Sequence, residues 1–323
     1  MNKKYKNEWV MRSMLFSFLV LFLLVSILIL EFALGKIGLG QPIIYEQNPA
    51  YGFTLMPDQK ITRFRNAKIR VNSSGLRSDY EWQSNLYKIL FHGDSVTYGG
   101  SYIDNSELFT QKVCDILGEG YRCGNAGINS YGVLNMVLRS RYDNRLNDAD
   151  TIVFTVIKED FLRGIAGADT AHYYLSEPNR WFPAIEELIN FAGYKYDINR
   201  FLGKKSTRSK QTQKHARAGA IEFAIKNLNE ELTRLKNKGK NVLVFYSPGK
   251  SETGVNPTEK NKGLIVQIKS NVKFLYDMTP HFSLKRDAIY YDAAHYEKAG
   301  HMIAAEVMAK VLSERITKKR NGH

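Results

Sequence analysis

The sequence contains only two cysteines, Cys114 and Cys123, and no cysteine or histidine pattern with zinc-ligand spacing. An aromatic RNA-binding signature and a basic-zipper pattern are missing as well. The net charge of +14 is therefore the only feature that favours nucleic acid, and we do not expect a nucleic-acid partner. No metal site is expected either.

The two cysteines allow two interpretations. In an oxidising, extracytoplasmic compartment they would form a disulfide. The alternative is a pair of buried free thiols, one on a helix and one on the following strand. Spacing alone does not give the distance between the two Cα atoms, so both interpretations stand at this point.

Residues 14–34 form an apolar stretch interrupted only by two serines and Glu31. Its length approaches the ~20 residues that span a bilayer and exceeds the roughly 7–15 of a signal-peptide core. We therefore predict an uncleaved membrane anchor; the alternative is a cleaved signal peptide, for which Ala33 and Gly35 have suitable spacing. The cations that precede the stretch are Lys3, Lys4, Lys6 and Arg12. They predict a cytoplasmic N-terminus and an extracytoplasmic domain, periplasmic or at the cell surface.

The chain divides into three parts by composition and local sequence pattern. Residues 1–35 are tail and anchor, residues 36–85 are an extended lead-in with turn signals and short strands such as 68–71, and residues 86–318 form the main domain. Short apolar runs without alternation predict buried strands at 88–91, 121–125, 151–157, 241–246 and 273–276. Helical periodicity follows at 221–235 and 298–316. This pattern predicts a three-layer α/β/α sandwich with a parallel five-stranded sheet.

An insertion at residues 165–217 is far longer than an ordinary connection, and we expect it to form a cap that sets specificity. Its second half, residues 204–217, is basic and almost free of apolar side chains. We interpret this run as a solvated surface; the alternative is docking to a membrane surface or an anionic glycan.

Three residues at strand ends suggest nucleophilic catalysis. Ser95 lies just after the first predicted strand, and Asp292 and His295 follow the last one. A serine hydroxyl becomes nucleophilic when an imidazole accepts its proton and a carboxylate orients that imidazole. Two other pairs have similar spacing, Asp169 with His172 and Asp277 with His281. Only the pair at 292 and 295 has the position expected of a site at the carboxyl ends of the strands.

These motifs resemble those of the SGNH hydrolase superfamily, the GDSL-type esterases. Gly93-Asp94-Ser95 is similar to the first sequence block of that family, residues 125–132 to the second and residues 292–295 to the last. Residues 72–77 are similar to a segment that precedes the catalytic domain in membrane-anchored members. The resemblance covers about residues 44–316 and implies a flavodoxin-like fold, Ser95 as nucleophile, Asp292 and His295 as its partners, and no cofactor.

Two positions depart from the family pattern, both at the oxyanion hole. The resemblance implies three hydrogen-bond donors there: the N–H of Ser95, the N–H of a glycine and the side chain of an asparagine. In this sequence the glycine position holds Ser130 and the asparagine position holds Glu159. Losing one such donor costs about 3 kcal/mol. Three alternatives follow: burial protonates Glu159, Lys158 or another donor substitutes, or activity is low or absent.

We weigh three functions on these grounds. The leading hypothesis is a membrane-anchored serine esterase that removes small acyl groups, such as acetyl, from a cell-surface carbohydrate. The second is an O-acetyltransferase that passes the same acyl group to a sugar hydroxyl. The third is a noncatalytic glycan-binding or scaffold protein, for which Glu159 is the main support.

Overall fold

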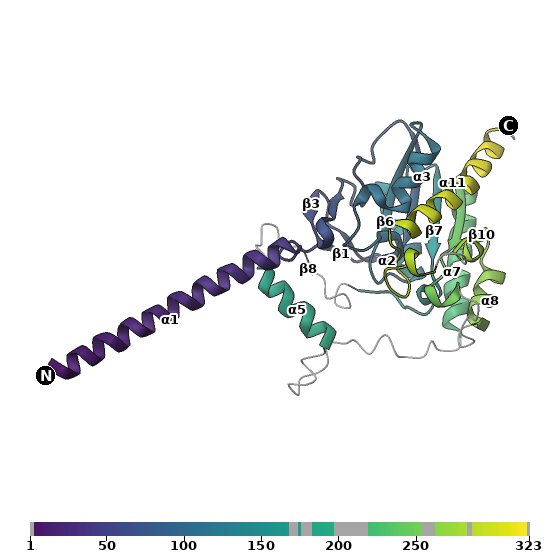
Figure 1. Cartoon of the computed structure of the whole chain (residues 1–323). Helices are drawn as coiled ribbons and strands as arrows, with labels where there is room; N and C mark the ends of the chain where they lie inside the picture. Colours follow the sequence, from purple (N-terminus) through teal and green to yellow (C-terminus); the bar gives the residue numbers. More distant parts are fainter. Residues whose placement is uncertain are drawn as a thin grey trace.

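The computed structural model describes residues 3–167, 174–175, 183–196, 219–253, 262–282 and 286–321. At its centre is a five-stranded parallel sheet with the order β10-β9-β7-β5-β6 (Figure 1). Read in chain order this is 2-1-3-4-5, the flavodoxin-like arrangement. The predicted fold class is confirmed. The strands are Tyr87–Gly93 (β5), Tyr121–Gly127 (β6), Thr151–Val156 (β7), Asn241–Tyr246 (β9) and Leu275–Asp277 (β10).

The sheet strands lie close to the five predicted apolar runs. The run at 241–246 matches β9, and β5 and β6 extend beyond the predicted bounds. The last strand was predicted from residue 273, but β10 begins at Leu275. Phe274 has a φ of 55°, in the left-handed region, so the backbone turns there before it becomes extended.

Helices cover both faces of the sheet and make two separate hydrophobic cores. Along β5, Leu90 belongs to one core, whereas Ile89 and Phe91 belong to the other, as the two-residue period of a strand requires. The first face is covered by α4 (Val133–Tyr142) and α7 (Ala220–Asn237). The second is covered by α3 (Phe109–Leu117) and α11 (Lys298–Asn321). The other helices of the sheet domain are α2 (Ser95–Tyr98), α8 (Lys262–Asn271), α9 (Thr279–Phe282) and α10 (Arg286–Ile289).

The lead-in is folded onto the main domain through two small sheets. The predicted strand at 68–71 is confirmed as β4 (Lys68–Val71), which pairs with β3 (Gln59–Thr62). A second sheet has the order β2-β1-β8 and joins the lead-in to the insertion. Its strands are Ile44–Asn48 (β1), Gly52–Leu55 (β2) and Tyr174–Leu175 (β8).

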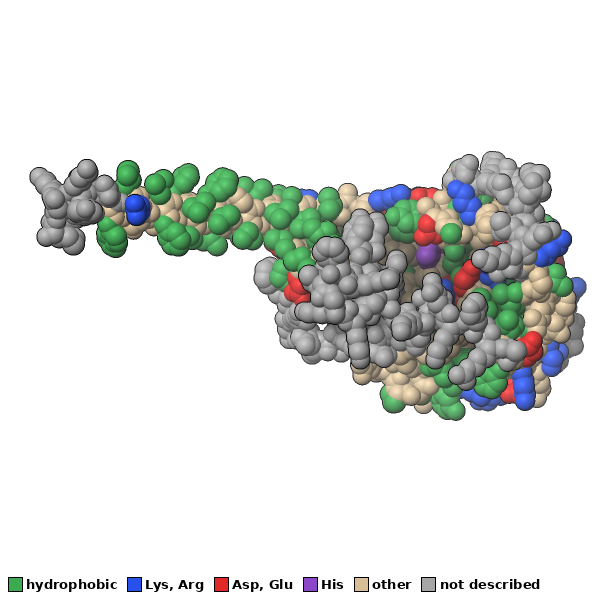
Figure 2. All heavy atoms as spheres, turned by 90° about the horizontal axis from the view of Figure 1, so that it is seen from below, with side chains coloured by type: hydrophobic (Ala, Val, Ile, Leu, Met, Phe, Trp, Pro, Cys, Tyr) green, Lys and Arg blue, Asp and Glu red, His purple; other side chains and the backbone are tan. Residues whose placement is uncertain are grey.

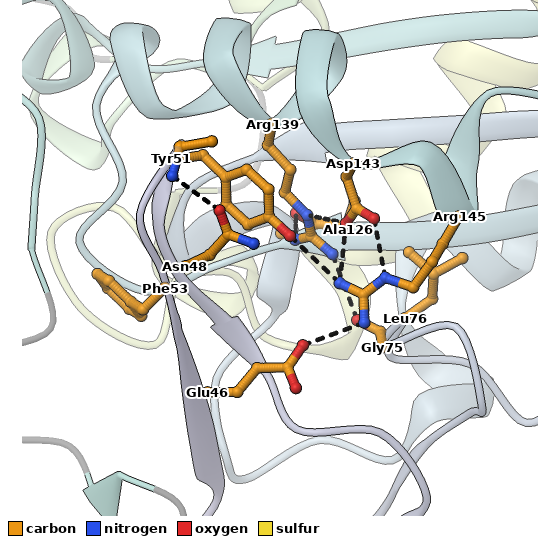
Figure 3. Close-up of polar contacts among 12 residues, drawn as sticks. Glu46, Asn48, Tyr51, Phe53, Gly75, Leu76, Ala126, Arg139, Asp143 and Arg145 are labelled. Carbon is orange, nitrogen blue, oxygen red and sulfur yellow. Dashed lines mark hydrogen bonds and ion pairs between the residues drawn. The ribbon is translucent and has the colours of Figure 1, made fainter.

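A buried ion network fixes the lead-in in place (Figure 3). Asp143 accepts hydrogen bonds from Arg145 at 2.8 and 3.0 Å and from the fully buried Arg139 at 3.3 Å. Arg145 also reaches the lead-in, where it donates to Glu46 at 3.1 Å and to the hydroxyl of Tyr51 at 3.3 Å. Removing one partner of such a network would leave a buried charge unpaired, so these contacts hold the two segments together.

The N-terminal helix α1 (Lys3–Lys36) projects away from the sheet domain (Figure 1). Its segment Trp9–Lys36 is long and apolar enough to cross a membrane by length and composition, a test that a signal sequence also passes. At its end, Glu31 accepts hydrogen bonds from the amides of Ala184 and Ile185, at the start of α5 (Ala184–Tyr196). The insertion's first described helix is thus attached to α1. The basic run at 204–217 lies outside the described residues.

Cys114 on α3 and Cys123 on β6 form a disulfide, with their Cα atoms 5.8 Å apart. Of the two sequence interpretations, the structure has the disulfide. Both cysteines lie in the core beneath α11, beside Val113 and Leu312.

Replacing both cysteines with alanine should lower the free energy of unfolding by about 2–3 kcal/mol, because the bridge restricts the unfolded chain. For a domain of this size, we expect the melting temperature to fall by roughly 4–12 °C. Thermal unfolding followed by circular dichroism, with the oxidised parent as reference, measures this. An unchanged melting temperature would show that the bridge adds nothing to stability.

Candidate active site

The three residues predicted at strand ends lie in one chain of hydrogen bonds. His295 Nε2 is 2.8 Å from Ser95 Oγ, and His295 Nδ1 is 2.7 Å from Asp292 Oδ2. The other oxygen of Asp292 accepts the amides of Ala294 and His295, each at 2.9 Å. Figure 2 shows a histidine side chain (purple) recessed in one face of the molecule, with acidic side chains (red) beside it. This arrangement can remove a proton from a serine hydroxyl.

The turn between β5 and α2 determines the position of Ser95. A Cβ atom on Gly93 would lie 1.9 Å from Thr97 Oγ1, so only glycine fits at the end of this strand. Asp94 is the N-cap of α2, and its carboxylate accepts the amide of Val96 at 2.9 Å. Ser95 is therefore held at the carboxyl end of β5, beside the point where the strand order reverses.

Asp292 and His295 occupy a closed loop after β10. The amide of Tyr291 donates to the carbonyl of His295 at 2.9 Å, and Tyr290 and Tyr296 form an antiparallel bridge. This closure brings residues three apart onto one turn, as the sequence analysis expected.

The alternative pair of Asp277 and His281 does not have this geometry. Asp277 accepts hydrogen bonds from Thr279 and pairs with Lys269 at 2.8 Å. His281 contacts the hydroxyl of Tyr276 at 3.0 Å. The pair of Asp169 and His172 lies outside the described residues.

Electrostatics favour a charged imidazolium at His295. Burial is the largest influence on its pKa and lowers it, but the hydrogen bond and charge of Asp292, helped by Asp94, outweigh burial and raise the pKa. Burial likewise opposes ionisation of Asp292, yet the bonds from His295 and the Ala294 amide lower the pKa of Asp292. Asp292 thus stays ionised and can stabilise the positive charge that His295 acquires on taking a proton.

A reaction in which neutral His295 removes the proton of Ser95 should become faster as pH rises, with a midpoint above the ordinary histidine value of 6.5. The reason is that the raised pKa of His295 keeps its imidazole protonated to a higher pH. Asp292→Asn should move the midpoint to lower pH, because the charge that supports the imidazolium is gone. Measuring kcat/KM from pH 5 to 9, corrected for spontaneous hydrolysis, tests this; a flat profile would contradict it.

Ser130 has a backbone conformation that favours glycine. Its φ is 66°, in the left-handed region, within a turn that the amide of Tyr131 closes on the carbonyl of Ile128 at 3.3 Å. A non-glycine residue pays roughly 1–2 kcal/mol for this conformation. The serine adopts this conformation and keeps a backbone N–H at the position.

The Glu159 side chain is 44% exposed and lies 3.3 Å from Lys158 Nζ. It therefore lacks the burial that the first of the three alternatives for the oxyanion hole requires. Lys158 is itself buried and binds Glu252 at 2.6 Å.

Arg163, which sequence reasoning missed, joins the first and second sequence blocks to Asp160, the neighbour of Glu159. Its Nη1 donates to Asp94 Oδ2 at 3.1 Å, to the carbonyl of Tyr131 at 2.9 Å and to Asp160 Oδ1 at 2.8 Å. The hydroxyl of Ser95 approaches the same oxygen of Asp94 at 3.5 Å. The Arg163 cation and the Ser95 hydroxyl thus share one oxygen of Asp94. Its spacing of three from Asp160 was the available signal.

The carboxylates around Arg163 are buried. Burial, followed by the charge of Asp94, raises the pKa of Asp160. Burial opposes the charge on Arg163, but Asp160 and Asp94 outweigh it and raise the pKa of Arg163. Within the described ranges, no group of three or more histidine, cysteine, aspartate or glutamate side chains is arranged to hold a metal ion.

No protein-family model and no curated protein matches the chain. Its structure is similar to a G-D-S-L family protein from Desulfitobacterium hafniense DCB-2, with 10% identity, a TM-score of 0.40 and coverage of 70% of this chain and 99% of that one. It is also similar to an acetyl xylan esterase, with 14% identity, a TM-score of 0.45 and coverage of 69% and 98%. An acetylxylan esterase from Geobacillus stearothermophilus has 18% identity, a TM-score of 0.41 and coverage of 69% and 93%. These are likenesses of fold, and no substrate follows from them.

Proposed function

We propose that the protein is a serine esterase in which Ser95, His295 and Asp292 form the catalytic triad. The observation that carries the proposal is the continuous hydrogen-bond chain from Asp292 Oδ2 through both ring nitrogens of His295 to Ser95 Oγ. A carboxylate on Nδ1 leaves Nε2 free to accept the serine proton. No metal or organic cofactor is needed for this chemistry.

The reaction has two halves. Ser95 Oγ attacks the ester carbonyl carbon while its proton passes to His295 Nε2, and the tetrahedral intermediate collapses when His295 gives that proton to the leaving alcohol. Water then attacks the acyl-serine with His295 as base. The acid is released, and Ser95 regains its proton.

The oxyanion needs hydrogen-bond donors other than the asparagine that the resemblance to GDSL-type esterases implies. We propose that the amides of Ser95 and Ser130 supply two donors and that the charge of Arg163 replaces the third. Arg163 supports this because it shares a carboxylate oxygen with Ser95 and binds the carbonyl of Tyr131, next to Ser130. A fixed positive charge at a site of low dielectric stabilises developing negative charge.

The proposed setting is the outer side of a membrane, with α1 as the anchor and the N-terminus in the cytoplasm. The apolar helix and the disulfide support this, since disulfides persist in oxidising compartments. The proposed substrate is a small acyl ester, such as acetyl, on a cell-surface carbohydrate.

Hydrolysis of an aryl acetate by the full chain in detergent tests the proposed activity. Released acid should accumulate with turnover above the buffer rate. Adding an oligosaccharide tests the acceptor: an esterase gives the same free acid, whereas a transferase diverts acyl groups to the sugar. No turnover of acetyl, propionyl or butyryl aryl esters would contradict the proposal.

A further inference from the structure

A pocket of about 400 Å³ lies beside the triad, between the lead-in and the start of α11. This is within the range of ~300–1,000 Å³ typical of small-molecule sites. Tyr102 forms part of its wall and stacks on Tyr291, the residue directly before Asp292. The hydroxyl of Tyr102 donates to the carbonyl of Tyr296, the residue directly after His295, at 3.0 Å, so this wall contacts the residues on both sides of the Asp292–His295 loop. The lining residues are Arg65, Ala67, Tyr102, Ile103, Asp104, Ala288, Glu297, Lys298 and Ala299.

The ring of Tyr102 and the guanidinium of Arg65 line this pocket, and Tyr291, which is not a lining residue, extends the aromatic surface by stacking on Tyr102. The rings of Tyr102 and Tyr291 stack with centroids 3.9 Å apart and an interplanar angle of 22°. The guanidinium carbon of Arg65 lies 5.5 Å from the first centroid and 5.2 Å from the second. Tyr291 remains 49% exposed, so part of this ring is open to a ligand next to the catalytic loop.

Arg65 is held there by a backbone conformation that arginine rarely adopts. Its φ is 58° and that of Asn66 is 59°, so two consecutive non-glycine residues lie in the left-handed region. The guanidinium then binds both carboxylate oxygens of Glu297 at 3.0 Å. Such conformations gather at binding and catalytic sites. The lead-in therefore supplies a strained, ordered side chain to a pocket beside the triad.

The charges of the pocket indicate a neutral ligand. Arg65 and Lys298 are balanced by Asp104 and Glu297. Arg65 is already paired with Glu297, and Asp104 accepts the amide of Lys68 at 2.6 Å. The four charged lining side chains therefore carry no net charge, and a neutral ligand with hydroxyl groups can hydrogen-bond to them without breaking the pair of Arg65 and Glu297.

We propose that this pocket is a subsite for a neutral sugar unit, adjacent to the ester-bearing unit of the glycan. The sugar's apolar face packs against Tyr291, and its hydroxyls bond with the side chains of Arg65 and Glu297. An amphipathic ring that offers one apolar face and several hydroxyls matches an exposed aromatic surface edged by charged groups. The subsite rests on the proposed esterase function and names its substrate class.

The test is equilibrium binding of tetrasaccharides to the full chain in a detergent without a sugar headgroup, by titration calorimetry. The probes are chitotetraose and cellotetraose, which are neutral, and tetragalacturonic acid, which is anionic. We expect saturable binding of at least one neutral probe and weaker binding of the anionic one. Binding needs no turnover, so this result stands apart from the aryl acetate assay: failure here with active enzyme overturns only the subsite.

Variants make the test specific. Tyr291→Ala should raise Kd for the neutral probe about tenfold, because an aromatic contact is lost. Tyr142→Ala, an exposed tyrosine on α4, is the matched control and should leave Kd unchanged. Arg65→Gly should also weaken binding without lowering the melting temperature, since glycine adopts this φ without strain. No saturable binding, stronger binding of the anionic probe, or equal Kd in the Tyr291→Ala and Tyr142→Ala variants would overturn the proposal.

Discussion

Replacing Ser95 with alanine should lower kcat for aryl acetate hydrolysis on the order of 10⁴-fold to 10⁶-fold. The oxygen of this hydroxyl is the atom that forms the acyl bond, and Ser95 is the residue whose hydroxyl bonds His295 in the described part of the chain. The melting temperature should change little, because Ser95 Oγ bonds only His295 and, weakly, Asp94. Steady-state kinetics on the full chain in detergent measures the loss.

The matched control for this prediction is Ser313→Ala on α11, where the hydroxyl bonds only the carbonyl of Lys310 at the surface. We expect parental rates from it. Asp292→Asn should lose about 10⁴-fold, because the imidazole then favours the wrong tautomer. An alanine variant of Ser95 that hydrolyses the ester at the parental rate would contradict the triad.

Replacing Arg163 with alanine should lower kcat about 100-fold, near the ~3 kcal/mol typical of losing one oxyanion donor. KM should change much less, since the charge acts on the transition state. Arg163 also has a structural role between Asp94 and Asp160, so the melting temperature has to be measured in parallel. A loss in stability with unchanged kcat would show that Arg163 is only structural.

A second substitution separates the two roles of Arg163. Glu159→Asn places an amide donor at the position that an asparagine has in GDSL-type esterases and removes a charge that opposes the oxyanion. In the Arg163→Ala background it should recover at least tenfold in kcat, whereas in the parent it should change kcat by only a few-fold. This non-additivity in a double-mutant cycle is the signature of a shared role. Equal effects of Glu159→Asn on kcat in both backgrounds would argue against the proposal that Arg163 takes the place of the missing asparagine.

The sheet and the three proposed triad residues leave local signals in the sequence. Buried parallel strands appear as short apolar runs, and Ser95 follows such a run directly, whereas Asp292 and His295 lie after α9 and α10, beyond the last strand. The start of β10 at Leu275 could not be predicted, because nothing in the sequence indicates that an apolar residue such as Phe274 has a left-handed φ.

Other parts of the site depend on contacts between distant segments. Arg65 meets Tyr291 only because the lead-in folds against the last loop, and no periodicity predicts that contact. Predicting the disulfide would have required the distance between the two Cα atoms, which sequence spacing does not give. Arg163 was hidden because its partner Asp94 belongs to a different block, 69 residues earlier.

Labelling with a fluorophosphonate is the most direct test of whether Ser95 is an activated nucleophile. The reagent phosphonylates a serine only when a neighbouring base activates it, so it reports the nucleophile independently of the natural substrate. Intact-mass and peptide mass spectrometry of the full chain in detergent should show one adduct, on the peptide that contains Ser95, and none in the Ser95→Ala variant. The account also predicts slower labelling of the His295→Ala variant. No adduct on Ser95 at high reagent concentration would contradict it and favour a noncatalytic protein.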